Sequence, residues 1–134
     1  YPNLNFSALQ GRLNWPSQGK ILNRYGHTIK GSQLKWGGTL IEAPENQPIY
    51  AIAAGNVVFS KWLAGYGQLI IINHGHGYMS LYGRLSSAYT TTGEHVHAGE
   101  EIATVGESGG FKKPALYFSI RHNAQPLNPT RWCR

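Results

Sequence analysis

The 134-residue sequence contains no aspartate, and all six of its acidic residues are glutamates. Aspartate is a frequent metal ligand, nucleophile and triad member, so its absence narrows the chemistry open to any site. The single cysteine, Cys133, excludes an intrachain disulfide. No run reaches the ~18 apolar residues of a membrane-spanning helix, and no signal-peptide pattern opens the chain. Because the opening Tyr1-Pro2-Asn3 lacks an initiator Met, we expect an excised domain of a longer exported protein.

Charged residues are scarce, at 13% of the chain, yet Lys and Arg outnumber the acids by 12 to 6. A net charge of +6 would suit an acidic or polyanionic partner. The basic residues are scattered singly or in pairs, however, so the net charge gives only weak information about the class of partner. The 41% hydrophobic content and the well-spread aromatic residues exclude a disordered chain. The length favours one compact domain.

Short runs of β-branched and aromatic residues, separated by Gly, Pro and Asn, dominate the chain after Trp15-Pro16. This pattern predicts an all-β (β-rich) domain, a sandwich or a meander, because no run of ten or more residues has a helical period. Residues 1–14 carry few turn signals, so we expect an N-terminal arm or short helix followed by a domain over 15–134. The predicted strands fall at residues 49–53, 57–59, 68–73, 78–82, 102–105 and 116–120.

Alternation along two of these strands assigns their faces, because successive side chains of a strand point to opposite sides. Near the C-terminus, one face is apolar and should enter the core, comprising Leu116, Phe118 and Ile120. The other face comprises Ala115, Tyr117, Ser119 and Arg121. After Gly77, Met79, Leu81 and Leu85 are predicted on one side, opposite Tyr78, Ser80, Tyr82 and Arg84. A face rich in Tyr and Arg fits an interaction surface, but it equally fits a half-wet outer sheet face.

Several short segments, from about Trp15 to Trp132, follow a familiar order and spacing. They include Arg24-Tyr25-Gly26, Gly65-Tyr66-Gly67, His74-Gly75-His76-Gly77-Tyr78, Tyr82-Gly83-Arg84-Leu85 and Val105-Gly106-Glu107-Ser108-Gly109. Together they resemble the LytM/lysostaphin-type zinc metallopeptidase family. The resemblance implies an antiparallel β-sheet sandwich with a central groove and little helix.

Active members of that family bind zinc through a His-x-x-x-Asp segment and the second His of a His-x-His segment. Placed on this sequence, those ligand positions fall on Trp36, Leu40 and Tyr117. Two further histidines that assist the chemistry fall on Arg84 and Ala115. Indole, isobutyl and methyl groups cannot bind zinc, and a fixed guanidinium would repel a cation. The resemblance therefore implies a degenerate peptidase with no catalytic residues, no metal and no cofactor.

Further segments, among them Leu34-Lys35-Trp36 and Met79-Ser80-Leu81-Tyr82-Gly83, resemble the degenerate LytM domain of EnvC-like cell-division proteins. That branch implies a periplasmic, non-catalytic activator of peptidoglycan N-acetylmuramoyl-L-alanine amidases in Gram-negative cell division. A helical segment of the amidase would enter the vacated active-site groove. We expect neither nucleic acid nor a membrane span, while direct peptidoglycan binding is the alternative. A peptidase with relocated zinc ligands is a less favoured alternative.

The predicted partner-binding groove is apolar and aromatic, with Arg121 as the candidate to pair with an acidic group. Its alternative interpretation is a vacated cavity that these side chains merely fill. The full predicted set is Lys35, Trp36, Leu40, Tyr66, Leu69, Tyr82, Arg84, Ala115, Tyr117 and Arg121.

Three other features suggest chemistry but have simpler interpretations. The pairs His74/His76 and His95/His97 resemble two-ligand metal sites, yet three protein ligands are normally needed, and no Asp or suitably placed Glu completes either set. We therefore interpret them as solvated turn histidines. Cys133 could act as a nucleophile only with a nearby base, and His122 is its one candidate.

Overall fold

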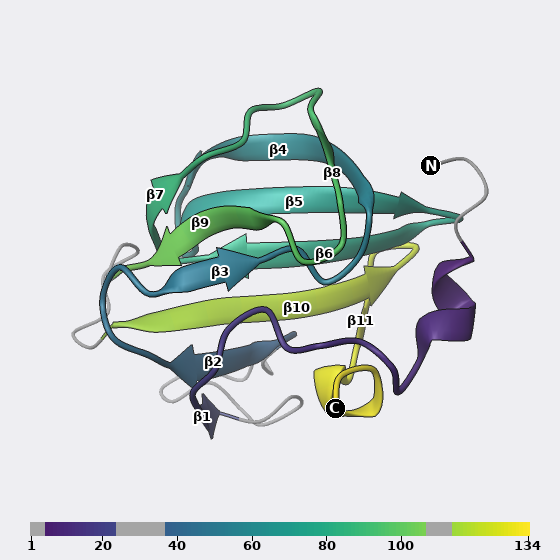
Figure 1. Ribbon diagram of the computed structural model, residues 1–134, viewed down its shortest axis with the longest axis horizontal. Coiled ribbons are helices and arrows are strands. Elements are labelled where there is room, and N and C mark those ends of the chain that lie inside the picture. The colour runs from purple at the N-terminus through teal and green to yellow at the C-terminus, as the bar shows by residue number, and fades with distance from the viewer. Residues whose placement is uncertain (1–4, 24–36, 107–113) are drawn as a thin grey trace.

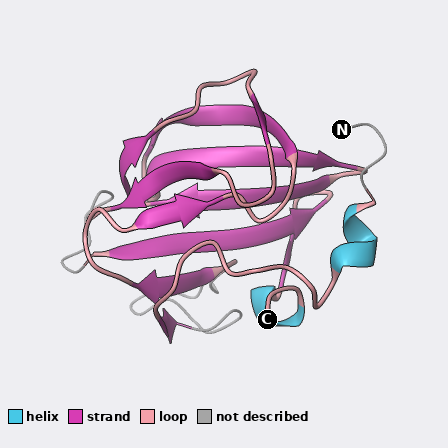
Figure 2. Cartoon of the chain, viewed as in Figure 1, coloured by secondary structure: helices cyan, strands magenta, loops and turns pink. Residues whose placement is uncertain are grey.

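The computed structural model describes residues 5–23, 37–106 and 114–134. Strands dominate it, and the helical content consists of two short 3-10 helices, η1 (Phe6–Leu9) and η2 (Pro129–Arg131), on the same side of the molecule (Figure 2). Among the described residues, every pairing between named strands is antiparallel. The all-β, antiparallel prediction is confirmed. No helix in the described ranges is long and apolar enough to span a membrane.

The strands form a large sheet with a small sheet lying over one of its faces (Figure 1). The large sheet has the order β1-β2-β10-β6-β5-β4-β8, and β11 pairs with β10. Its strands are β1 (Lys20–Asn23), β2 (Thr39–Glu42), β4 (Gly55–Leu63), β5 (Gly67–Gly75), β6 (Tyr78–Gly83), β8 (His95–Val96), β10 (Ala115–His122) and β11 (Gln125–Leu127). The small sheet has the order β3-β9-β7, with β3 (Pro48–Tyr50), β7 (Leu85–Ala88) and β9 (Glu101–Val105).

A tight turn joins β5 to β6 and sets the register of the central hairpin. Gly75, His76 and Gly77 all have positive φ, at 92°, 53° and 83°. Two glycines suit this turn because L side chains with a Cβ rarely adopt the left-handed region. The hairpin then pairs Asn73 with Met79 and Ile71 with Leu81.

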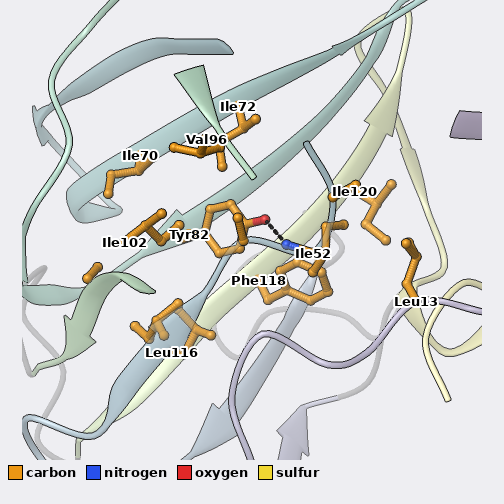
Figure 3. Packing of buried hydrophobic residues seen from close by; sticks show 14 of the residues in the cluster. Leu13, Ile52, Ile70, Ile72, Tyr82, Val96, Ile102, Leu116, Phe118 and Ile120 are labelled. Atoms are coloured by element: carbon orange, nitrogen blue, oxygen red, sulfur yellow. Dashed lines mark hydrogen bonds between the residues drawn. The ribbon is translucent and has the colours of Figure 1, made fainter. Parts of the chain in front are cut away.

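The main core lies between the two sheets (Figure 3). Leu116, Phe118 and Ile120 of β10 are fully buried there, which confirms the face assigned to them. Burial of such side chains is the main source of stability for this kind of fold. The small sheet contributes, among others, Ile49, Ile102, Ala103 and Val105, and the segment after β3 contributes Ile52.

The N-terminal segment is packed onto the sandwich through η1. Phe6 is fully buried, and its ring stacks on His74 at 4.7 Å and on Trp132 at 5.1 Å between ring centroids. Further along, Leu13 forms an isolated parallel bridge with Cys133. Residues 5–14 thus contribute two core side chains, Phe6 and Leu13, while a domain boundary at residue 15 stays a prediction.

Candidate partner-binding surface

A second, smaller apolar cluster covers the other face of the large sheet. Its buried members are Leu40, Leu69, Leu81 and Tyr117, and the partly buried side chains packed on them are Phe59, Tyr66, Ile71 and Met79. We call these eight residues the outer cluster. They come from β2, β4, β5, β6 and β10 and from the turn between β4 and β5. The sheet itself separates them from the main core, because neighbouring residues of each strand point to opposite faces.

Sheet register explains why these positions meet. Leu40 on β2 lies directly opposite Tyr117 on β10. On the next strand, Leu81 lies opposite both Ser119 and Ile71. Directly paired residues in an antiparallel sheet share a face with Cβ atoms about 5 Å apart. Two positions that the resemblance equates with zinc ligands are therefore neighbours here.

These residues do not fit a zinc ion. Leu40 offers only an aliphatic group, Ala115 on the same face of β10 is a fully buried methyl, and a phenol such as Tyr117 is a poor zinc ligand. Across the described part of the chain, no three His, Cys, Asp or Glu residues are placed to hold a metal. The other candidate positions, Lys35 and Trp36, lie outside the described residues.

A cation and two phenols stand at the polar end of the outer cluster. The Tyr66 and Tyr117 rings meet edge to face with centroids 5.3 Å apart. Arg121 donates through Nη2 to the Tyr117 hydroxyl at 3.4 Å and through Nε to Ser119 Oγ at 3.3 Å. Ser119 in turn donates to the Gly37 carbonyl at 2.6 Å. Arg121 is thus held in place while remaining only partly buried.

Burial raises the pKa of the Tyr117 hydroxyl, although the charge of Arg121 and the hydrogen bond it donates oppose that rise. Tyr117 therefore stays neutral at physiological pH, and Arg121 places its positive charge beside an apolar surface. A carboxylate brought to this position would gain a charge-assisted hydrogen bond in a partly desolvated setting.

The assignment of Tyr82 to the groove is wrong. Tyr82 is fully buried in the main core, where it pairs in register with Phe118 on one side and Ile70 on the other. Both partners point inward, so Tyr82 must do the same. Its hydroxyl accepts a hydrogen bond from the Ile52 N–H at 3.1 Å (Figure 3).

Strand alternation fails at Arg84 and Leu85. Arg84 follows the end of β6 with a positive φ of 63°, and its N–H donates to the Tyr66 carbonyl at 2.7 Å. The chain passes here from the large sheet to β7 of the small sheet. Arg84 is consequently buried at this crossing, and Leu85 belongs to the main core and not to the side of Met79. The rule of alternating faces holds only within one continuous strand.

His74 is not a solvated turn residue, as the sequence had suggested. It lies on β5, is only 2% exposed, and begins a row of hydrogen bonds through both of its ring nitrogens. Its Nδ1 lies 2.8 Å from the Ala54 carbonyl, its Nε2 lies 2.7 Å from Ser80 Oγ, and Ser80 Oγ lies 2.8 Å from the Tyr82 hydroxyl. Burial lowers the pKa of His74 to about 4, despite the opposing effect of the bond to Ala54.

This chain of contacts has one arrangement that satisfies every member. A carbonyl only accepts, so neutral His74 carries its proton on Nδ1 and donates it to Ala54. Nε2 then faces the Ser80 hydroxyl as an acceptor, Ser80 Oγ is also hydrogen-bonded to the Tyr82 hydroxyl, and Tyr82 accepts from the Ile52 N–H. We call this set the buried relay. We interpret it as structural, because it joins strands through the main core.

The remaining residues with candidate chemistry are dispersed. His76, His95 and His97 are exposed. Cys133 is only 5% exposed, and burial raises the pKa of its thiol to about 12. Such a thiol is a poor nucleophile because the reactive form is the thiolate. His122 instead stacks on Tyr78 with ring centroids 4.0 Å apart.

A protein-family model matches most of the chain. Residues 34–129 match the model of peptidase family M23. The chain is 46% identical over 125 residues to the murein hydrolase activator EnvC of Escherichia coli, covering 93% of this chain and 30% of that protein. It is 36% identical over 135 residues to the murein hydrolase activator NlpD of Salmonella typhimurium, covering 98% and 34%. The chain thus spans about a third of the length of these relatives.

Solved structures share the same fold. A zinc-containing peptidase from Vibrio cholerae superposes with a TM-score of 0.82 at 22% identity, over 90% of this chain and 40% of that one. The catalytic domain of the antimicrobial peptidase lysostaphin from Staphylococcus simulans superposes with a TM-score of 0.76 at 25% identity, over 83% and 89%.

Proposed function

Since the chain belongs to peptidase family M23, we propose that it is a non-catalytic member that activates a peptidoglycan amidase through its outer cluster. The partner would be an N-acetylmuramoyl-L-alanine amidase in the periplasm of a Gram-negative cell. Relatives named as murein hydrolase activators support the activating role. The relative named as a lipoprotein, YgeR of Escherichia coli, supports a place in the cell envelope.

The observation that carries the proposal is the chemistry of the positions equated with zinc ligands. A hydrolase needs polar ligands and an open coordination position there. Instead, Leu40 and Tyr117 are direct register partners within an apolar cluster. Leu40 and Tyr117 are therefore unsuited to hold a zinc ion that would activate water. An apolar surface of this kind is what a binding partner requires.

The outer cluster suits an amphipathic helix with an acidic residue beside its apolar face. Aliphatic and aromatic side chains from five strands would receive the apolar face. The fixed guanidinium of Arg121, between Tyr66 and Tyr117, would receive the carboxylate. Tyr and Arg are the side chains most often found as binding anchors. Whether a groove accommodates the helix stays a prediction.

The decisive experiment measures dye release from labelled cell wall by the domain alone, an amidase alone, and the two together. Release from the mixture well above the sum of the separate reactions supports the proposal. Release by the domain alone would overturn it and would require a zinc analysis of the protein. Sedimentation of the domain with cell wall, without any activation of several amidases, would favour the alternative of a peptidoglycan-binding module.

A matched pair of variants then locates the surface. Arg121→Ala should weaken amidase binding about 10- to 100-fold, as removal of an anchor does, corresponding to roughly 1–3 kcal/mol. Arg131→Ala removes the same charge from an exposed position on η2, and affinity should be unchanged. Calorimetric titration measures both. Equal losses of affinity in the two variants would mean that amidase binding depends only on net charge. The proposal that the outer cluster is the binding surface would then be refuted.

A further inference from the structure

An open pocket of about 570 Å³ lies away from the outer cluster, between residues 14–18 and strand β3. Figure 1 shows this segment and β3 on the side of the large sheet that also carries β7 and β9. The outer cluster occupies the opposite face of that sheet. The volume falls within the range of about 300–1,000 Å³ typical of small-molecule sites. Its lining includes Asn14, Trp15, Gln18, Gln47, Tyr50 and Arg134.

The two walls of the pocket are tied together by hydrogen bonds. The Tyr50 N–H donates to the Pro16 carbonyl at 2.9 Å. The Gln47 side-chain amide donates to Ser17 Oγ and to the Gln18 carbonyl, each at 2.7 Å. The edge of the Trp15 ring packs on Phe118 in the core, with centroids 6.1 Å apart. The site is therefore preformed, and a ligand would lose little affinity to ordering these walls.

The composition of the pocket favours a particular ligand chemistry. Trp15 and Tyr50 offer aromatic surface, and the Tyr50 side chain is 42% exposed. Around them stand amide side chains, which both donate and accept hydrogen bonds, and one cation, Arg134. Because Gln47 uses its amide hydrogens on the opposite wall, its carbonyl oxygen is fixed as an acceptor. No Asp or Glu side chain stands among the described residues that line the pocket.

A saccharide matches this arrangement. One face of a pyranose ring presents C–H groups that pack on an aromatic ring, while its hydroxyl and acetamido groups need paired donors and acceptors. Arg134 would bind a carboxylate substituent. We infer that the pocket between residues 14–18 and β3 binds an acidic amino-sugar disaccharide of the kind found in murein. This site is separate from the amidase-binding surface and does not depend on it.

Calorimetric titration with the disaccharide N-acetylglucosaminyl-N-acetylmuramic acid tests the inference. Tyr50→Ala should lower the affinity at least tenfold, whereas Tyr89→Ala, which removes another exposed tyrosine, should leave it unchanged. Arg134→Gln should weaken binding of this acidic disaccharide but not of neutral N,N′-diacetylchitobiose. The thermal midpoint of each variant checks that it is folded.

Three results would overturn the inference: no saturable binding at millimolar disaccharide, equal losses in the Tyr50 and Tyr89 variants, or loss of sugar binding in Arg121→Ala. The last result would move the sugar to the outer cluster. The two proposals can thus fail separately, because amidase activation depends on Arg121 and sugar binding on Tyr50.

Discussion

Mild acid should destabilise this domain through the buried relay, and the effect can be assigned to His74. In the unfolded chain the imidazole titrates near its ordinary pKa of 6.5, whereas burial lowers its pKa to about 4 in the folded protein. Between these values the unfolded state binds a proton that the folded state rejects. The free energy of unfolding should therefore fall as the pH drops from about 6.5 toward 4, and His74 should have little influence above that window.

The magnitude follows from the two pKa values. A tenfold change in proton affinity is worth about 1.4 kcal/mol, so the full difference corresponds to roughly 3 kcal/mol. At about pH 5 the loss is partial, and linkage gives roughly 2 kcal/mol relative to neutral pH. Solvent screening does not reduce this figure much, because His74 is 2% exposed. Protonation would also place a second donor on His74, at Nε2, which faces Ser80 Oγ.

Urea denaturation at several pH values between about 4.5 and 7.5 measures this effect, for the parent protein and for His74→Gln. The variant has a side chain that donates and accepts but does not titrate, so its stability should depend less on pH by roughly 2 kcal/mol at about pH 5. His76→Gln removes an exposed histidine two residues away and serves as the control. If the parent and the His74 variant lose stability in parallel, the assignment to His74 is refuted.

Two further predictions concern buried groups. Tyr82→Phe leaves the Ile52 N–H and Ser80 Oγ without their partner, and should lower the free energy of unfolding by about 1–3 kcal/mol in chemical denaturation, with an unchanged fold by circular dichroism. A smaller loss than about 0.5 kcal/mol would mean that water replaces the hydroxyl. Cys133, with its buried thiol and a pKa of about 12, should react with iodoacetamide far more slowly in the folded than in the urea-unfolded protein. Equal rates at neutral pH would show that the thiol is accessible.

Much of the fold was predictable because local chemistry repeats along the chain. Alternation within β10 correctly assigned Phe118 and its neighbours to the core, since a continuous strand presents successive residues to opposite faces. Turn glycines at 75 and 77 marked the hairpin between β5 and β6, because its backbone needs positive φ. The membership in an M23-type fold followed from many short segments in a fixed order, which a single sequence displays directly.

The positions of three side chains, those of Tyr82, Arg84 and His74, depended on tertiary structure. Tyr82 points into the core because Phe118 and Ile70 flank it on neighbouring strands, and no pattern within its own strand reveals those partners. Arg84 lies where the chain changes sheets, so counting by twos from Met79 fails there. His74 is buried by η1 through the ring of Phe6, sixty-eight residues earlier in the sequence.

The sequence by itself determined which residue types stand at the positions that the family resemblance equates with zinc ligands, and hence the expectation that ordinary zinc chemistry has no ligands there. It could not show that Leu40 and Tyr117 are register partners, or that Arg121 is fixed against Tyr117. Residue identity sets which interactions are possible at a position. Strand order and register set which residues meet, and both depend on pairing between segments far apart in the chain.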